Sequence, residues 1–166
     1  MHVAVISLPL APLFFLILQA LDPQGSRRLA ITAGTLAFGF GAAFVVLDTV
    51  GAHWPRASGW ITLAAGMCLA GAGLLATGTF GPRRLRQPWV ALVLGFCAAF
   101  GAAPIPNGVA MALGTLAALA LALVVYFARL SFSKHPVDGI LLLIAGALVA
   151  NGSYAGLGFW LVEWFS

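Results

Sequence analysis

Long apolar runs separated by short polar breaks dominate this chain. Each run is about long enough for a helix that crosses a bilayer and contains no charged residue. The six runs cover about 3–20, 29–47, 59–80, 88–104, 108–128 and 139–161. The breaks hold residues that commonly end helices, such as the Gly81-Pro82 pair between the third and fourth runs. The pattern predicts an all-α integral membrane protein, with residues 1–166 forming a single transmembrane domain built as a six-helix bundle.

The composition supports a lipid environment. Hydrophobic residues make up 62% of the chain and charged residues only 7%, whereas soluble domains carry roughly 25% charged residues. The expected partner of most of the surface is therefore the lipid bilayer. The net charge of +4 comes from basic residues in short loops, which indicates membrane topology rather than nucleic-acid binding.

The basic residues predict an orientation. Seven of the eight fall in the first, third and fifth loops between the runs, and only Arg56 lies elsewhere. The seven are Arg27, Arg28, Arg83, Arg84, Arg86, Arg129 and Lys134. Because loops rich in Lys and Arg stay in the cytoplasm, we expect a multi-pass protein of the inner or plasma membrane with both termini on the extracytoplasmic side.

The chain partly matches itself at an offset of 80 residues. Residues 31–50 against 111–130, and 59–78 against 139–158, share 12 identities in 40 positions, where chance would give roughly 4 in so biased a composition. A repeat of three helices would insert its second copy upside down, which predicts two inverted halves. The alternative is a shared bias towards Gly and Ala, which allow helices to pack closely.

One polar segment interrupts the middle of the sixth run. It contains Asn151, Ser153 and Tyr154, and in the self-alignment it faces Gly71 and Gly73 of the third run. Paired weak points at equivalent depth are typical of a transporter's binding site. These five residues are the predicted substrate or permeation site. The alternative is that the polar groups only form hydrogen bonds between helices.

A second polar group is expected at the outer face. His2, Asp48, His53 and Glu163 come from the ends of three predicted helices. Imidazole and carboxylate groups together can bind a divalent ion or respond to pH, but their spacing matches no metal motif. The sequence therefore predicts no metal, no cofactor and no catalytic residue.

Three functional classes remain. The first is a channel or transporter for a small, neutral or weakly polar solute. The second is an accessory or structural subunit of a larger membrane complex, so a second copy or other membrane subunits are the expected protein partners. The third, an enzyme at the membrane interface, would depend on Asp48, His53 and Glu163 and is not favoured, because no catalytic motif is visible. In size and expected topology the chain is similar to amide and urea channels, but it carries no motif of that family.

Overall fold

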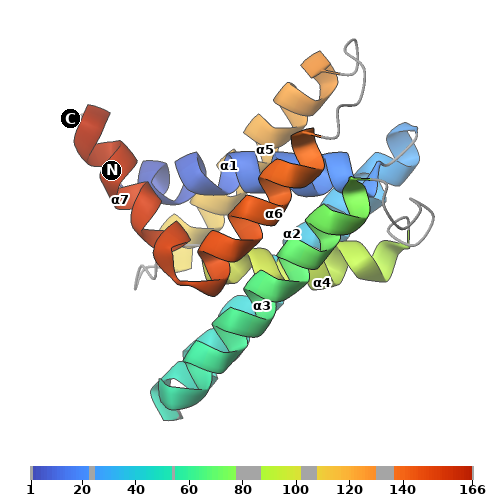
Figure 1. The fold of residues 1–166 in the computed structure, drawn as a ribbon. Helices are drawn as coiled ribbons and strands as arrows, with labels where there is room; N and C mark the ends of the chain where they lie inside the picture. Colours follow the sequence, from blue (N-terminus) through green and yellow to red (C-terminus); the bar gives the residue numbers. More distant parts are fainter. Residues whose placement is uncertain are drawn as a thin grey trace.

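The chain is all-helical in the part that the computed structural model describes (Figure 1). The described residues are 2–22, 25–53, 55–77, 87–101, 108–129 and 137–165. The helices are α1 (His2–Leu21), α2 (Ser26–His53), α3 (Pro55–Ala76), α4 (Pro88–Ala98) with the short 3-10 turn η2 (Ala99–Gly101), α5 (Gly108–Arg129), α6 (Val137–Ala150) and α7 (Ser153–Phe165). The expected all-α fold is confirmed. The first five apolar runs each correspond to one helix, and the sixth is divided into α6 and α7.

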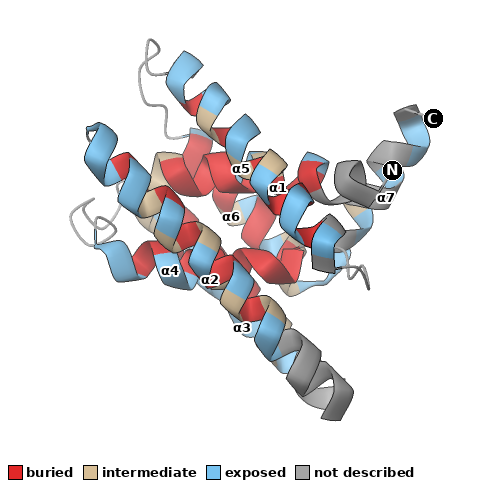
Figure 2. Ribbon diagram, turned by 180° about the vertical axis from the view of Figure 1, so that it is seen from behind, coloured by how far each residue is buried: buried red, intermediate tan, exposed pale blue. Residues whose placement is uncertain are grey.

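Three helices in the described part are long and apolar enough to cross a membrane. The qualifying segments are Ser26–Val46, Gly59–Ala76 and Met111–Ala128. The segments Ser7–Leu21, Pro88–Gly101 and Val137–Ala150 are also apolar helices but are shorter. The outward faces carry large apolar side chains in the open, and Figure 2 shows these faces as exposed stripes along the helices. So much exposed apolar surface is unusual for a soluble monomer.

Helix α1 forms the centre of the core. It contacts α3, α4, α5, α6 and α7, and six consecutive residues, 13–18, are buried. A helix that buries side chains on all sides of its axis must be surrounded by other helices. From α2, Phe40 packs edge-on against Phe14 of α1, with ring centroids 5.6 Å apart. The interior around α1 is therefore filled with side chains.

Helices α3 and α6 form one close pair through small residues. A Cβ atom added to Gly66 would lie 2.2 Å from the backbone nitrogen of Ala150, and one added to Gly146 would lie 2.3 Å from that of Ala70. The residue numbers run in opposite directions along the contact, so the pair is antiparallel. The absence of side chains at these glycines lets the backbones approach, as in small-residue packing of membrane helices.

Helices α2 and α4 form a second close pair. A Cβ atom added to Gly39 would lie 2.1 Å from the carbonyl oxygen of Leu92, and one added to Gly95 would lie 2.1 Å from the carbonyl oxygen of Leu36. Both helices begin at the same end of the molecule (Figure 1), so they run in roughly the same direction. The third extensive pair is α1 with α5, and these two helices also run in roughly the same direction (Figure 1).

The helix ends are sorted between two sides of the molecule. In Figure 1 the end of α1 and start of α2, the end of α3 and start of α4, and the end of α5 and start of α6 lie towards the right. Both chain termini lie on the left, close together in this view and in the reverse view (Figures 1 and 2). The helix ends that flank the first, third and fifth loops therefore share one side, and the termini share the other.

Candidate solute site at a helix break

The sixth apolar run is broken at Asn151 and Gly152. Helix α6 ends at Ala150, these two residues form a turn, and α7 begins at Ser153. Gly152 has a φ of +72°, a left-handed conformation that glycine adopts without the steric cost other residues meet. The turn is closed by a hydrogen bond from the Gly152 N–H to the carbonyl oxygen of Val149, at 2.9 Å. The predicted weak point of this run is thus a break in the helix.

The break presents polar groups at its surface. The side chains of Asn151 and Ser153 are exposed, and the Asn151 amide donates a hydrogen bond to the Ser153 hydroxyl oxygen at 3.3 Å. The last carbonyl groups of a helix and the first N–H groups of the next have no partner within their own helix. Such a break therefore adds backbone donors and acceptors to the two polar side chains.

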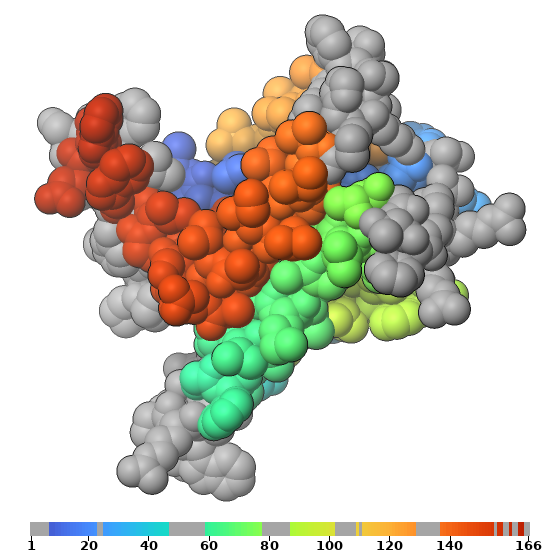
Figure 3. Space-filling model, viewed as in Figure 1, coloured from blue at the N-terminus to red at the C-terminus, as the bar shows by residue number. Residues whose placement is uncertain are grey.

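Asn151 stands at the edge of a shallow groove between α3 and α6. The groove has a volume of about 400 Å³ and is lined by Leu63, Gly66, Met67, Ala70, Ala147, Ala150 and Asn151. Figure 3 shows α6 lying directly against α3 along the face in view. One amide in an otherwise apolar lining can form hydrogen bonds with a neutral solute but cannot neutralise a charged one. We call these seven residues the α3–α6 groove.

Tyr154, the third polar residue of the predicted site, lies in the core of the molecule. It is buried, with 6% of its surface exposed, and its hydroxyl donates a 2.6 Å hydrogen bond to the carbonyl oxygen of Pro9. The phenol therefore joins the start of α7 to α1 and does not line the α3–α6 groove. A buried hydroxyl with a partner of this kind contributes to stability.

The two glycines predicted in the third run do not interrupt their helix. Helix α3 is continuous from Pro55 to Ala76, so the expectation of a matching weak point at Gly71 and Gly73 is wrong as local structure. Gly73 packs against the backbone of α6 at Leu143, whereas nothing lies within 4 Å of a Cβ placed on Gly71. Neither glycine lines the groove beside Asn151.

The sequence pattern did not identify the α3 residues that lie beside the helix break. Gly66 and Ala70 line the groove with Asn151. The self-alignment pairs Asn151 with Gly71, but equivalence in a repeat is not contact. In an antiparallel pair the contacting residue moves back along one helix as it moves forward along the other, which brings Asn151 near the turn that contains Gly66. The small-residue spacing in the third run was the signal for this face.

Most of the predicted outer polar group lies outside the described side chains. His2 begins α1, Asp48 and His53 lie in the last turns of α2, and Glu163 lies in α7. The side chains of the first three lie outside the described ones, and Glu163 is exposed. Within the described residues, no group of three or more His, Cys, Asp or Glu side chains could hold a metal ion.

Comparison with known proteins adds no relative. No protein-family model, curated protein or solved structure matches this chain. The functional interpretation therefore depends on the geometry of the chain itself.

Proposed function

We propose that this protein is a small channel or transporter of the inner or plasma membrane that passes a small, neutral or weakly polar solute along the α3–α6 groove. The observation that carries the proposal is the helix break at Asn151 and Gly152. Broken helices are typical of solute sites in membrane proteins, because the break supplies backbone polar groups at membrane depth. Irregular backbone at that depth is tolerated where it lines a cavity or is covered by protein.

The pairing of helices supports an inverted repeat. If the two halves are exchanged, α1 replaces α4, α2 replaces α5 and α3 replaces α6. The pair α1–α5 then becomes α4–α2, which is the second extensive pair, and α3–α6 becomes itself. Contacts of α1 with α6 likewise become contacts of α4 with α3, which are also present. These correspondences are what a twofold axis in the membrane plane produces, whereas the contact of α2 with α3 has no comparable α5–α6 contact among the described residues.

The directions and register of the helices support the same exchange. The pairs α1–α5 and α2–α4 each run in one direction, and α3–α6 is antiparallel, as inversion requires (Figure 1). At the offset of 80 residues, Gly66 becomes Gly146 and Ala150 becomes Ala70. The close contact of Gly66 with Ala150 is therefore exchanged for the contact of Gly146 with Ala70, and both are present.

The distribution of helix ends supports six spanning segments with both termini outside. The ends that flank the three arginine-containing or lysine-containing loops lie on one side of the molecule, and the termini lie on the other (Figure 1). Three helices meet the length of a full span. Helix α1 has 20 residues and is surrounded by neighbouring helices, which lowers its need for an apolar face towards lipid.

Solute flux into liposomes tests the proposal. Purified protein would be reconstituted, and swelling would be followed by light scattering under gradients of small amides and polyols. We expect swelling faster than in protein-free liposomes for at least one solute. Asn151→Leu should reduce the excess rate at least tenfold, because it removes the only side-chain amide of the groove.

Gly34→Leu provides the matched control. Gly34 is exposed on α2 with nothing within 4 Å of an added Cβ, so the added side chain should leave both the fold and flux unchanged. The proposal fails if no solute of the panel enters faster than in protein-free liposomes. It also fails if Asn151→Leu conducts as the unmodified protein does while remaining folded.

One observation favours the second candidate, an accessory subunit of a larger complex. The amide of Asn151 is exposed at the molecular surface, and a polar group facing lipid is costly unless a partner covers it. A helix of another subunit could supply that cover. Native purification in mild detergent separates the two functions, since stoichiometric foreign subunits would favour the complex and a lone chain or homo-oligomer would favour the channel.

A further inference from the structure

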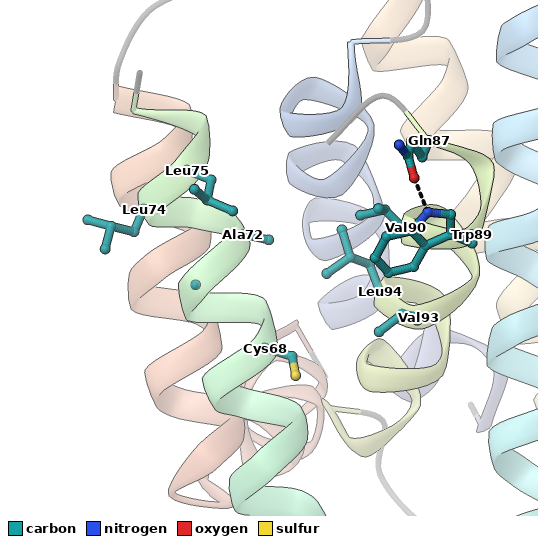
Figure 4. Close-up of a pocket in the computed structure, with 10 residues that line it drawn as sticks. Cys68, Ala72, Leu74, Leu75, Gln87, Trp89, Val90, Val93 and Leu94 are labelled. Atoms are coloured by element: carbon teal, nitrogen blue, oxygen red, sulfur yellow. Dashed lines mark hydrogen bonds between the residues drawn. The ribbon is translucent and has the colours of Figure 1, made fainter. Parts of the chain in front are cut away.

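A larger groove lies between α3 and α4, on the other side of α3 from the helix break. Its volume is about 790 Å³, and its α3 wall contains Cys68, Gly71, Ala72, Leu74 and Leu75. Its α4 wall contains Gln87, Trp89, Val90, Val93 and Leu94. Each wall extends over about 10 Å of helix. We call these ten residues the α3–α4 groove (Figure 4).

The groove is apolar along its length and polar at one end. The Trp89 indole N–H donates a hydrogen bond to the side-chain oxygen of Gln87 at that end, and Cys68 lies towards the other (Figure 4). Between them the lining consists of aliphatic side chains and Gly71. Tryptophan prefers the interface between headgroups and acyl chains. The arrangement fits a ligand with a long apolar tail and a polar head.

The sequence that joins the two walls is strongly basic. Residues 78–86 connect the end of α3 to Gln87, and they contain Arg83, Arg84 and Arg86 but no acidic residue. Each basic residue near an anionic membrane surface contributes about 1 kcal/mol of attraction. The positive charge is thus attached by the chain to the polar end of the groove, not to the Cys68 end.

We propose that the α3–α4 groove binds an acyl chain of an anionic phospholipid, with the headgroup at the end formed by Gln87 and Trp89. The acyl chain lies along Gly71 and Ala72, where the absence or small size of the side chain leaves space between the helices. This proposal depends on the membrane placement argued above, but not on solute passage. A defect in lipid binding and a defect in flux can therefore be measured separately.

Fluorescence quenching by brominated lipids tests the proposal, because Trp89 is part of the site and is 60% exposed. The four other tryptophans, Trp54, Trp60, Trp160 and Trp164, would be replaced by phenylalanine. The single-Trp protein would be reconstituted in vesicles containing brominated phosphatidylglycerol or brominated phosphatidylcholine at equal mole fraction. We expect phosphatidylglycerol to bind next to Trp89 at least threefold more strongly than phosphatidylcholine.

Filling the groove should remove this preference. Gly71→Leu places a side chain in open space within the groove, so the variant should fold normally while the ratio of the two association constants falls to about one. Gly34→Leu adds the same side chain to open space on α2 and should keep the preference. Val93→Phe, from the opposite wall, repeats the test if Gly71→Leu folds poorly.

Two results would overturn the proposal. Equal quenching by the two lipids in the protein with an open groove would mean that only ordinary boundary lipid contacts Trp89. A preference that survives in folded Gly71→Leu or Val93→Phe would place the anionic lipid outside the groove. Flux measured on the same vesicles reports on the α3–α6 groove alone, so a lost lipid preference with intact flux leaves the proposed function standing.

Discussion

A single methyl group should destabilise the protein when added at Gly66 and not when added at Gly71. Both glycines lie inside α3, five residues apart. A Cβ on Gly66 would meet the backbone nitrogen of Ala150 at 2.2 Å, whereas a Cβ on Gly71 meets nothing within 4 Å. Because the obstructing atoms include backbone of α6, no change of rotamer can relieve the clash.

The size of the effect follows from the geometry. Ordinary contact begins near 3.4 Å, so α3 and α6 must separate locally by about 1.2 Å (3.4 − 2.2 = 1.2) to admit the methyl group at Gly66. Overpacking of this kind typically costs about 1–3 kcal/mol. The intrinsic helix preference of Ala over Gly, about 0.5–1 kcal/mol, is gained by both variants and cancels in the comparison. Gly66→Ala should therefore be less stable than Gly71→Ala by about 1–3 kcal/mol.

Unfolding in detergent micelles measures this difference. Titration with SDS, followed by circular dichroism and tryptophan fluorescence, gives the free energy of unfolding for each variant. Gly146→Ala should behave as Gly66→Ala does, because its Cβ would lie 2.3 Å from the backbone nitrogen of Ala70. Equal stabilities of Gly66→Ala and Gly71→Ala would refute the close α3–α6 contact.

Three further predictions concern single side chains. Tyr154→Phe should lower the free energy of unfolding by about 1 kcal/mol and leave solute flux unchanged, because the lost hydroxyl donates its hydrogen bond to Pro9. Reduced flux in a variant of unchanged stability would show instead that Tyr154 belongs to the solute site. Gly152→Ala should cost about 1–2 kcal/mol in the same SDS titration, because the φ of +72° disfavours a Cβ, and an unchanged midpoint would contradict the left-handed turn. The thiols of Cys68 and Cys97 are free and lie close to each other across the α3–α4 contact. Mild oxidation should therefore join α3 to α4 within one chain, and mass spectrometry after alkylation would show two thiols still reactive if the helices are placed otherwise.

The all-α fold could be predicted from the sequence, and α1 and α5 begin and end within one residue of their apolar runs, whereas the ends of α2 and α3 lie three to six residues from theirs. Charge-free apolar runs have few stable forms other than helices, and Gly152 marks the break because weak helix formers surround it. Cys68 and Cys97 lie in two different apolar runs, and their proximity in the structure could not be predicted from the sequence. Which helix packs on which depends on the three-dimensional path of the chain, about which the apolar runs say nothing.

The self-alignment was informative for only part of the chain. In the third and sixth runs, the aligned residues Gly66 and Gly146 make equivalent close contacts, with Ala150 and Ala70 respectively. In the second and fifth runs, Leu36 is fully buried, whereas its aligned partner Leu116 is 61% exposed. Because adjacent residues differ by 100° around a helix, a small error in register moves an identity to the opposite face. The identity of Leu36 with Leu116 therefore does not mark equivalent positions in the two helices.

The location of the break has a consequence for the kind of transport. In carriers built from inverted halves, both halves commonly contain an interrupted helix, and exchanging their conformations moves the site between the two sides of the membrane. Here α3 is continuous through Gly71 and Gly73, whereas its counterpart is divided at Asn151 and Gly152. Under the proposed inversion, the two halves therefore cannot exchange roles at the break itself. A single fixed break beside the tight contact of Gly66 with Ala150 favours a pathway with little rearrangement. Of the two forms of the proposed function, the geometry therefore favours a channel over an alternating-access carrier.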